Sequence, residues 1–337
     1  MSEACGALWR VAVTGCAGFI GSHVAAALRL SGASIVCIDN LSRAGWYPLL
    51  LLRYHGIRVE AVDVRDYDAV VRLLDGVDAV VHTAAYISVP ESVQKPSLYA
   101  SNNVNATASL LEAVRDSGVE ALVYTSSAAV YGEPSRIPIT EDHPVRPVNP
   151  YGLFKACEEQ LIRMLSAGYG YRYMILRLFN VYGPGQSRGY AGVVERFAEA
   201  FTSGEPVTIY GDGTQTRDFI HVYDVSAAVI ASLKALLGGT AGNETLNIAS
   251  GRETSIKTLY RVFEELTARQ PPVIHAPPRP GDVARSVASV EKAWRVIGFR
   301  SSMGLREGLS TVLAYHTDPI GLLIRSPAPL PGTSSAR

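Results

Sequence analysis

Tyr151 and Lys155 stand four residues apart in the segment Tyr-Gly-Leu-Phe-Lys, a spacing at which two side chains can act on one ligand. In a helix this spacing places both side chains on the same face. A free tyrosine has a pKa near 10 and is only about 0.1% ionised at neutral pH. A lysine ammonium and a cationic cofactor ring that lowered this pKa by ~3 units would supply roughly 4 kcal/mol of phenolate stabilisation. The pair therefore predicts a tyrosine general base, although the same spacing also occurs by chance in structural helices.

A run of glycines near the N-terminus could bind a phosphate group. The apolar segment 11–14 leads directly into Gly15, Gly18 and Gly21, and a helical pattern follows. At such a turn the backbone can approach a pyrophosphate closely, although glycines can also serve helix packing alone. Asp39 ends the next apolar run, at the separation expected of a carboxylate that binds the ribose hydroxyls of a dinucleotide. Because a carboxylate would repel a 2′-phosphate, we expect NAD and not NADP.

The elements that must position these residues follow from the hydrophobic pattern of the first half of the chain. Apolar β-branched runs alternate with longer amphipathic segments, which is typical of βαβ units around a buried parallel sheet. The expected strands are 11–14, 34–39, 58–62, 78–82, 121–125 and 173–178, and the expected helices are 19–30, 67–74 with Asp66 as N-cap, 98–116 and 150–167. We predict an α/β fold with a doubly wound parallel Rossmann sheet. Ligands should bind at the carboxyl edge of this sheet.

The second half of the chain has shorter elements separated by Gly and Pro. Helices are expected at 193–202, 222–237, 256–268 and 290–297. This pattern predicts a second, smaller α/β lobe that binds the substrate. The expected domains are a NAD-binding domain over 1–179, rejoined by parts of 215–250, and a substrate lobe over 180–318. The polar, Pro-rich stretch 319–337 is expected to be a flexible tail.

The composition is that of a well-packed globular protein, with 47% hydrophobic and 18% charged residues in a chain of 337. Lys and Arg (31) balance Asp and Glu (31) without a basic run, which argues against nucleic acid as the main partner. With no apolar span of roughly 20 residues and no secretory signal, we expect a cytoplasmic protein with no membrane partner. The cysteines, Cys5, Cys16, Cys37 and Cys157, show no CxxC pair or nearby His, so we predict free thiols and no metal site.

The glycines recur at every third residue, and this GxxGxxG spacing resembles the extended branch of the short-chain dehydrogenase/reductase superfamily. Further segments narrow the resemblance to nucleotide-sugar 4-epimerases of the UDP-galactose 4-epimerase type, from residue 11 to about residue 315. These are Glu91-Ser-Val-Gln-Lys-Pro, Asn102-Asn-Val-Asn-Ala-Thr, Ser127-Ala-Ala-Val-Tyr-Gly, Asn149-Pro-Tyr, Arg177-Leu-Phe-Asn-Val-Tyr-Gly-Pro, Gly211-Asp-Gly, Arg217-Asp-Phe-Ile-His-Val and Arg279-Pro-Gly-Asp. The resemblance implies NAD as cofactor, a UDP-hexose as substrate and epimerisation at C4.

The resemblance also assigns roles to single residues. Ser127 would bind the reacting hydroxyl and share proton transfer with Tyr151 and Lys155, although a serine there could simply satisfy its loop. The expected cofactor-binding residues are Gly15, Gly18, Phe19, Ile20, Gly21, Asp39, Asn40, Asp63, Val64, Ala84, Ala85, Asn103, Tyr151 and Lys155, with helix capping as an alternative role for Asp63. The expected substrate-binding residues are Ser127, Asn180, Tyr210, Arg217, Arg279, Asp282 and Ser286. Guanidinium forks suit diphosphate oxygens, but such arginines can also form surface pairs. His221 is expected to order its strand.

The residues after Ser127 distinguish the reactions of this branch. Dehydratases of the family carry an Asp-Glu pair there and sugar-acid decarboxylases a Glu in second place, whereas this chain has Ala128 and Ala129. Without a second acid/base group, oxidation at C4, rotation of the keto sugar and return of the hydride remain, which is epimerisation. The alternatives are a 4-ketoreductase or dehydratase acting on nucleotide sugars, or a non-catalytic NAD-binding regulator.

The resemblance has two further implications. The residue at the position of Ser286 lies beside the sugar C2 substituent in the family, and a small residue there leaves room for an N-acetyl group. The helices expected at 98–116 and 150–167 form a four-helix dimer interface in relatives, so we expect a homodimer, with Ala100, Ala106, Ala108 and Ala113 allowing close approach.

Overall fold

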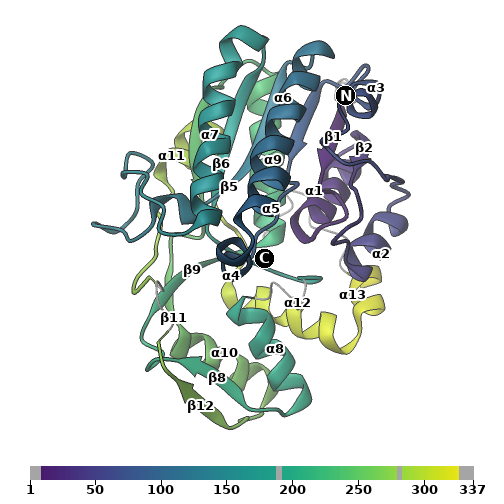
Figure 1. The fold of residues 1–337 in the computed structure, drawn as a ribbon. Helices are drawn as coiled ribbons and strands as arrows, with labels where there is room; N and C mark the ends of the chain where they lie inside the picture. Colours follow the sequence, from purple (N-terminus) through teal and green to yellow (C-terminus); the bar gives the residue numbers. More distant parts are fainter. Residues whose placement is uncertain (1–8, 187–191, 279–282, 326–337) are drawn as a thin grey trace, which may run out of the picture.

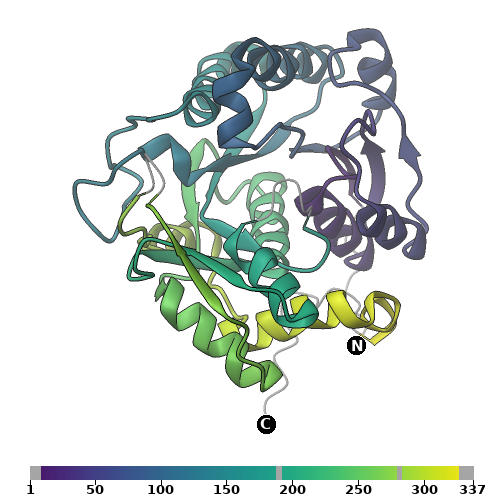
Figure 2. The same ribbon diagram turned by 60° about the horizontal axis from the view of Figure 1, so that its bottom comes forward.

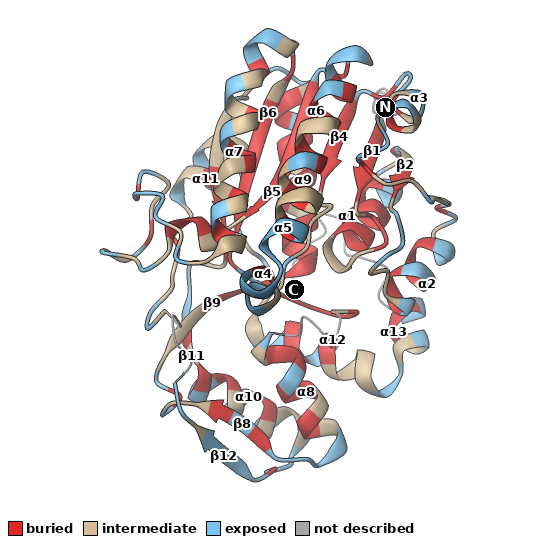
Figure 3. Ribbon diagram, in the orientation of Figure 1, coloured by how far each residue is buried: buried red, intermediate tan, exposed pale blue. Residues whose placement is uncertain are grey.

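The computed structural model describes residues 9–186, 192–278 and 283–325. At its centre is a seven-stranded parallel sheet with the order β10-β6-β5-β4-β1-β2-β3 (Figure 1). The strands are β1 (Arg10–Thr14), β2 (Ser34–Ile38), β3 (Val59–Glu60), β4 (Ala79–His82), β5 (Ala121–Ser127), β6 (Arg172–Leu178) and β10 (Glu244–Ile248). The central strands are buried (Figure 3), because helices cover both faces, and this explains their continuous apolar runs. The predicted Rossmann sheet is confirmed.

Two strands differ from the prediction. β3 is only Val59–Glu60, shorter than the expected 58–62. β10 was not expected, because its sequence Glu-Thr-Leu-Asn-Ile alternates polar and apolar residues and lies far along the chain from its neighbour. It pairs in parallel with β6 at the edge of the sheet, where a strand needs less apolar surface.

Two layers of helices cover the sheet (Figure 2). One layer holds α1 (Phe19–Leu30), α2 (Trp46–Tyr54), α9 (Val222–Leu237) and α11 (Glu291–Ile297), and the other holds α3 (Tyr67–Leu73), α6 (Ala106–Asp116) and α7 (Pro150–Tyr169). The expected N-cap is confirmed, because the Asp66 side chain accepts a hydrogen bond from the backbone of Ala69. Each layer has its own apolar core against the sheet, as a doubly wound fold requires.

The helix expected at 98–116 is composite. It consists of α5 (Pro96–Tyr99), a π-helical segment (Ala100–Asn105) and α6, and it follows the short α4 (Val89–Gln94). The π-helical segment turns Asn103 into the protein, where it is fully buried. A π segment of this kind often occurs at a functional site. The hydrophobic pattern alone did not predict it, because the π segment is only six residues long and lies between α-helical segments.

A second, smaller body of elements follows β6. It contains two small sheets, β11-β9-β7 and β12-β8, together with α8 (Val193–Ser203), α10 (Ile256–Thr267) and α12 (Leu305–Thr317). The strands are β7 (Asn180–Tyr182), β8 (Val207–Tyr210), β9 (Thr216–His221), β11 (Glu253–Ser255) and β12 (Val273–Ala276). Its core of aromatic and aliphatic side chains is separate from those of the large sheet. The smaller α/β lobe is therefore present, while the exact domain boundaries stay a prediction.

The expectation of a flexible tail from residue 319 is wrong in its first part. Residues Pro319–Arg325 form α13, and Leu323 packs against Ala26 and Leu51 of the large body. Asp318 accepts a hydrogen bond from the backbone of Gly321 in the first turn. The prediction weighed the Pro-rich stretch as one unit and overlooked the apolar residues that precede it. Residues 326–337 lie outside the described residues.

Candidate functional site

The glycine turn joins β1 to α1 at the carboxyl edge of the large sheet. Gly15 has a positive φ of 68°, and its N–H donates to the carbonyl of Ile38 (2.8 Å). A Cβ atom at Gly15 would lie 2.6 Å from the backbone of Ala84, and one at Gly21 would lie 2.2 Å from the carbonyl oxygen of Gly15. The turn therefore needs glycine at both positions, because the backbone of β1, α1 and the loop after β4 meet there.

A cavity opens beside this turn. It is lined by Gly15, Gly18, Phe19, Ile20, Gly21, Asp39, Asn40, Ser42, Arg43, Asp63, Val64, Thr83, Ala84, Ala85, Tyr86, Ile87, Asn102, Ala106 and Gln186. Most of the predicted cofactor-binding residues are among them. Asn103 is buried next to the cavity wall, where its side-chain amide bonds the N–H (2.9 Å) and the carbonyl (3.0 Å) of Tyr86. It therefore shapes the loop after β4 that lines the cavity.

Asp39 is held rigidly at the end of β2. Its Oδ2 atom accepts a hydrogen bond from the N–H of Ala17 (3.0 Å), and its Oδ1 atom accepts one from the N–H of Leu41 (2.8 Å). Burial raises the pKa of this carboxyl, and the two backbone hydrogen bonds act against that rise. The carboxylate is thus fixed at the cavity wall with lone pairs left to accept from hydroxyl groups. This arrangement fits the ribose of a dinucleotide.

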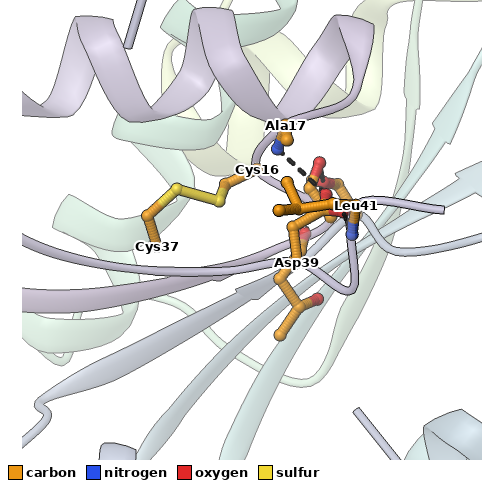
Figure 4. The surroundings of a disulfide bond; sticks show 8 residues. Cys16, Ala17, Cys37, Asp39 and Leu41 are labelled. Carbon is orange, nitrogen blue, oxygen red and sulfur yellow. Dashed lines mark hydrogen bonds between the residues drawn. A yellow bond between two sulfur atoms is a disulfide. The ribbon is translucent and has the colours of Figure 1, made fainter. Parts of the chain in front are cut away.

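The prediction of free thiols is wrong for two of the cysteines. Cys16 of the glycine turn and Cys37 of β2 form a disulfide whose Cα atoms lie 5.6 Å apart (Figure 4). β1 and β2 are neighbours in the sheet, with Val13 opposite Cys37, and this brings Cys16, the second residue after β1, within reach of Cys37. Because the two cysteines are 21 residues apart along the chain, the sequence pattern did not indicate this contact. Cys157 is a free thiol, and Cys5 lies outside the described residues.

Asp63 lies at the far side of the cavity, within an ionic cluster. Its carboxylate accepts hydrogen bonds from both Nε (2.9 Å) and Nη2 (2.8 Å) of Arg65 and from the side-chain amide of Asn40 (2.8 Å). The hydrogen bonds from Arg65 hold the pKa of Asp63 well below its usual range. Asp63 therefore orders the loop beneath Asn40. An adenine contact would have to use the lone pairs that remain.

Sequence reasoning missed the pair Arg43 and Tyr86, which contact each other in the lining of the cavity. The guanidinium carbon of Arg43 lies 3.5 Å from the centre of the Tyr86 ring, and its Nη2 atom lies 2.8 Å from Glu91 of α4. The three residues come from the loops after β2 and β4 and from α4. Only the fold brings them together, although Arg43 stands just four residues after Asp39 and could have been examined for that reason.

The predicted catalytic residues meet at the end of β5. Ser127 is the last residue of β5, and its Oγ atom accepts a hydrogen bond from the N–H of Ala129 (3.2 Å). Tyr151 lies in the first turn of α7, which is capped by the side chain of Asn149. A hydrogen bond between the side chains of Ser127 and Tyr151 favours the phenolate, but burial dominates and raises the pKa of Tyr151 to about 12. The base needs a further source of stabilisation.

Lys155 lies one turn along α7 from Tyr151 and is only 3% exposed. Its Nζ atom donates to the hydroxyl of Tyr124 (3.0 Å) and to the carbonyl of Thr125 (3.1 Å). Burial lowers the pKa of Lys155, and the nearby carboxylates of Glu158 and Glu159 oppose this effect. A lysine that stays charged in this position supplies the positive field that a phenolate requires.

A buried ionic cluster fixes α7 against the sheet. Glu159 is 1% exposed and accepts hydrogen bonds from Nε (2.9 Å) and Nη2 (2.7 Å) of Arg177 on β6. It also accepts one from Ser126 of β5 (2.6 Å) and one from Arg163 (2.8 Å). Because these bonds connect α7 with β5 and β6, they fix the position of Tyr151 on the helix relative to Ser127 on the strand.

The predicted substrate residues lie in or next to the smaller lobe. Asn180 is an exposed residue at the start of β7, and Tyr210 ends β8. Arg217 of β9 donates to the carbonyl of Val283 (2.6 Å), so it lies beside the segment that contains the half-buried Ser286. Arg279 and Asp282 lie outside the described residues. The structure thus brings Arg217 to the segment of Ser286.

His221 orders the junction between β9 and α9, as expected. Its Nδ1 atom accepts a hydrogen bond from the N–H of Tyr223 and caps α9, and its Nε2 atom lies 3.0 Å from Thr311 of α12. Burial lowers its pKa to about 3, so the ring is neutral at physiological pH. Over the parts of the chain that the structure describes, no group of three His, Cys, Asp or Glu side chains could hold a metal ion, and no helix could cross a membrane.

Comparison with known proteins decides the family. The model of the NAD dependent epimerase/dehydratase family matches residues 11–249, which is more than half of the chain. The chain belongs to this family. A relative among curated proteins, the putative UDP-glucose 4-epimerase of Methanocaldococcus jannaschii, is 35% identical over 310 residues, 90% of this chain and 97% of that protein. The resemblance drawn from the sequence is confirmed.

Solved structures of the epimerase/dehydratase family agree with the fold. The UDP-glucose 4-epimerase of Thermotoga maritima, solved with UDP-glucose, superposes with a TM-score of 0.86 at 33% identity, over 92% of this chain and 99% of that one. The UDP-glucose 4-epimerase of Thermus thermophilus, solved with NAD, has a TM-score of 0.82 at 36% identity, over 92% of this chain and 100% of that one. The similarity therefore extends through both lobes.

Proposed function

We propose that this protein is an isomerase that epimerises a nucleotide sugar at C4 with NAD as cofactor, and that UDP-glucose and UDP-galactose are its substrates. One observation carries the proposal. Ser127, Tyr151 and Lys155 meet at the carboxyl end of β5, beside a cavity built for a dinucleotide, and Ala128 and Ala129 follow directly. The related proteins that bear the name UDP-glucose 4-epimerase support this reading over a dehydratase, a ketoreductase or a regulator.

The cavity fits NAD on its own evidence. The glycine turn leaves no room for a side chain at Gly15 or Gly21, so a pyrophosphate can reach the backbone at the N-terminus of α1. The Asp39 carboxylate at the wall suits two ribose hydroxyls and would repel a 2′-phosphate. Gly15, Gly21 and Asp39 would hold NAD here, and the bound cofactor would supply the acceptor and donor of a hydride for C4 of the sugar.

The protein residues move and hold a proton during this exchange. Tyr151 accepts the proton of the C4 hydroxyl as general base and returns it to the opposite epimer as general acid. Lys155 stabilises the phenolate, because its ammonium group lies on the same face of α7. Ser127 bonds Tyr151 and positions the reacting oxygen. With alanine at positions 128 and 129, no side chain there can remove a second proton, so elimination of water has no base.

We further propose how the substrate is held. Asn180, Arg217, Arg279 and Asp282 hold the nucleoside diphosphate: the arginines bind the diphosphate oxygens and Asp282 a ribose hydroxyl. Tyr210 lies beside the base. Support comes from the chemistry of these groups and from the contact between Arg217 and the 283–286 segment. Ser286 lies in this segment and would face the C2 substituent.

We also propose a homodimer in the cytoplasm. Leu153 (49% exposed) and Met164 (78% exposed) lie eleven residues apart on one face of α7, and Leu98 of α5 is also exposed, so an apolar stripe is available to a second copy. Ala106 and Ala113 cannot contribute, contrary to our expectation, because they pack in the core of their own chain.

Light scattering should give about twice 36.2 kDa, and Met164→Glu should give monomers. Fractionation of cells, with detection of the protein in each fraction, tests the proposed cytoplasmic location.

A panel of substrates tests the function. The purified protein is incubated with UDP-, dTDP- and GDP-hexoses, and the products are resolved by anion-exchange chromatography. The proposal predicts interconversion of UDP-glucose and UDP-galactose without added cofactor, and no product from Tyr151→Phe. A dehydrated product, or no product with any sugar while NAD remains bound, would contradict it.

A further inference from the structure

A buried carboxylate, Glu158, lies beside Lys155, and neither the cofactor nor the substrate sites described above give it a role. We propose that Glu158 is a positioning residue, whose charge keeps Lys155 in the cationic form that Tyr151 needs. The inference rests on the proposed function only where it takes Tyr151 as the base. The charge of Lys155 can be measured in the resting protein.

The geometry places Glu158 behind Lys155. The two residues are three apart on α7, with exposed fractions of 0% and 3%. The Oε2 atom of Glu158 lies 3.6 Å from the Nζ atom of Lys155. The hydroxyl of Tyr124 lies between them, since it accepts from Lys155 (3.0 Å) and donates to the same Oε2 atom (2.7 Å). Lys155 and Glu158 are therefore coupled both directly and through a hydroxyl group.

The direction of the remaining hydrogen bonds can be worked out. Thr107 of α6 donates its only hydroxyl proton to Glu158 (3.0 Å), so the bond between Thr107 and the Nε2 atom of His82 (2.9 Å) must be donated by the histidine. The Nδ1 atom of His82 then accepts from Thr14 (2.7 Å), which requires a neutral ring. This agrees with burial, which lowers the pKa of His82 to about 3. The chain of donors from His82 through Thr107 therefore ends on Glu158.

Among the charged groups around Lys155, Glu158 is the one placed to keep the lysine protonated. The ionisable groups that face it are Tyr151, Glu158 and Glu159 of α7, Tyr124 of β5 and His82 of β4. His82 is neutral, and Glu159 is already paired with Arg177 (2.7 Å) and Arg163 (2.8 Å). Within the described ranges, the one ion pair of Glu158 is that with Lys155. Its second oxygen, Oε1, is buried and has no hydrogen-bond partner there.

Two opposing effects act on Tyr151. The Glu158 charge disfavours the phenolate directly, and it favours the phenolate indirectly by keeping Lys155 protonated against its burial. Coulomb energy falls with distance. Glu158 is in ion-pair contact with Lys155 and has no contact of this kind with Tyr151, so the indirect effect should dominate. Loss of the Glu158 charge should therefore weaken the base.

The charge of Lys155 can be followed by NMR with lysine labelled at Cε, because the chain has only five lysines, at positions 95, 155, 234, 257 and 292. The Lys155 signal is assigned as the one missing from Lys155→Met. Glu158→Gln should lower the pKa of Lys155 by at least about one unit, as removal of a close counter-charge does. An unchanged titration in folded Glu158→Gln would overturn the proposal.

Thr107→Val is the matched control. It removes one hydrogen bond from the same carboxylate but leaves its charge, so the Lys155 titration should move by no more than about 0.3 units. An equal shift in both variants would mean that packing, and not charge, moved the lysine, and would contradict the proposal. Should Glu158→Gln fail to fold, Glu158→Asp keeps the charge and should keep the Lys155 titration close to that of the unchanged protein, whereas a fall of a full unit would count against the proposal.

Turnover gives a second readout. Glu158→Gln should lower kcat with KM changed less than about twofold, and the alkaline limb of the kcat profile should move to lower pH, because Lys155 then loses its proton earlier. An equal loss of kcat at every pH would indicate a structural role. If the unchanged protein epimerises no sugar, the proposed function fails, but the NMR titration still decides the role of Glu158.

Discussion

The Nζ atom of Lys155 lies 3.1 Å from the carbonyl oxygen of Thr125, and this contact ties α7 to the strand that ends in Ser127. Helix and strand carry the two halves of the proposed proton-transfer site. Because this acceptor is a backbone carbonyl, the contact joins the lysine directly to the sheet, in addition to its side-chain contacts with Tyr124 and Glu158.

Removal of the Tyr151 hydroxyl tests the base. Tyr151→Phe keeps the ring and its packing but cannot accept the proton of the sugar, and general acid–base groups contribute typically 10²–10⁴-fold in rate. We expect kcat to fall by at least about 100-fold while the nucleotide sugar still binds. The measurement is steady-state kinetics together with calorimetric binding. A variant that retains more than about a tenth of the rate would place the base elsewhere.

Tight retention of the cofactor follows from a reaction with no net redox change. NAD should co-purify with the protein, be released on denaturation and need no addition during turnover. Asp39→Ala should lose it, because the ribose hydroxyls then lack their acceptor. Analysis of the supernatant by liquid chromatography gives the content. Turnover that consumes stoichiometric NAD and accumulates NADH would show a dehydrogenase instead.

The size of residue 286 should decide which hexoses fit. Ser286 is small, so we expect at least partial turnover of the UDP-N-acetylhexosamine pair beside UDP-glucose and UDP-galactose. Ser286→Tyr should suppress the acetylated pair selectively, by roughly 5- to 150-fold in relative kcat/KM, because overpacking costs about 1–3 kcal/mol. Competition assays with both pairs measure the ratio. Equal loss on both pairs would exclude this residue as the gate.

Three buried neutral histidines should make the protein sensitive to acid. Burial lowers the pKa of His23 to about 4 and those of His82 and His221 to about 3. The unfolded chain takes up these protons below about pH 6.5, whereas the folded chain does so only near pH 3 to 4. The contribution of the three neutral rings to the free energy of unfolding is therefore fully present above about pH 6.5. It falls as the pH drops, by about 2 kcal/mol per histidine at pH 5.

Denaturant unfolding at several pH values checks this slope. His23→Gln keeps a donor for the carbonyl of Pro184 and should make the dependence shallower by about 1.2 kcal/mol per pH unit between pH 4.5 and 6. The slopes of the two proteins are compared, and not their absolute free energies of unfolding, because the substitution also changes packing. A His23→Gln slope equal to that of the unchanged protein would mean that this ring does not stay neutral.

The sequence was sufficient for six of the seven strands of the central sheet and for the residues that follow them. Buried runs such as 121–125 are longer and more apolar than any turn, and the glycine turn and Tyr151–Lys155 pair have spacings tied to one local geometry. Contacts between distant segments were not predictable in this way. The Cys16–Cys37 disulfide and the Arg43–Tyr86 contact depend on which strands become neighbours, and β10 was missed because an edge strand need not be apolar.

Glu158 shows the same limit within the site. In the sequence it is one of two adjacent glutamates on an amphipathic helix, where acidic residues are usually exposed. Only the packing of α6 and β5 against α7 shows that both are buried, and that one pairs with arginines while the other faces Lys155. Helical spacing predicted that Tyr151 and Lys155 share one face of the helix, but it did not predict how far that face is buried.

The most direct test of the proposed mechanism follows one hydrogen atom. UDP-galactose that carries deuterium at C4 is converted in ordinary water, and the UDP-glucose formed is analysed by NMR and mass spectrometry. If the hydride is taken from C4 and returned to the same carbon within the closed site, the product retains the deuterium at C4. Replacement of that deuterium by solvent hydrogen would contradict epimerisation by hydride return, and with it the roles assigned to Tyr151, Lys155 and the cofactor cavity.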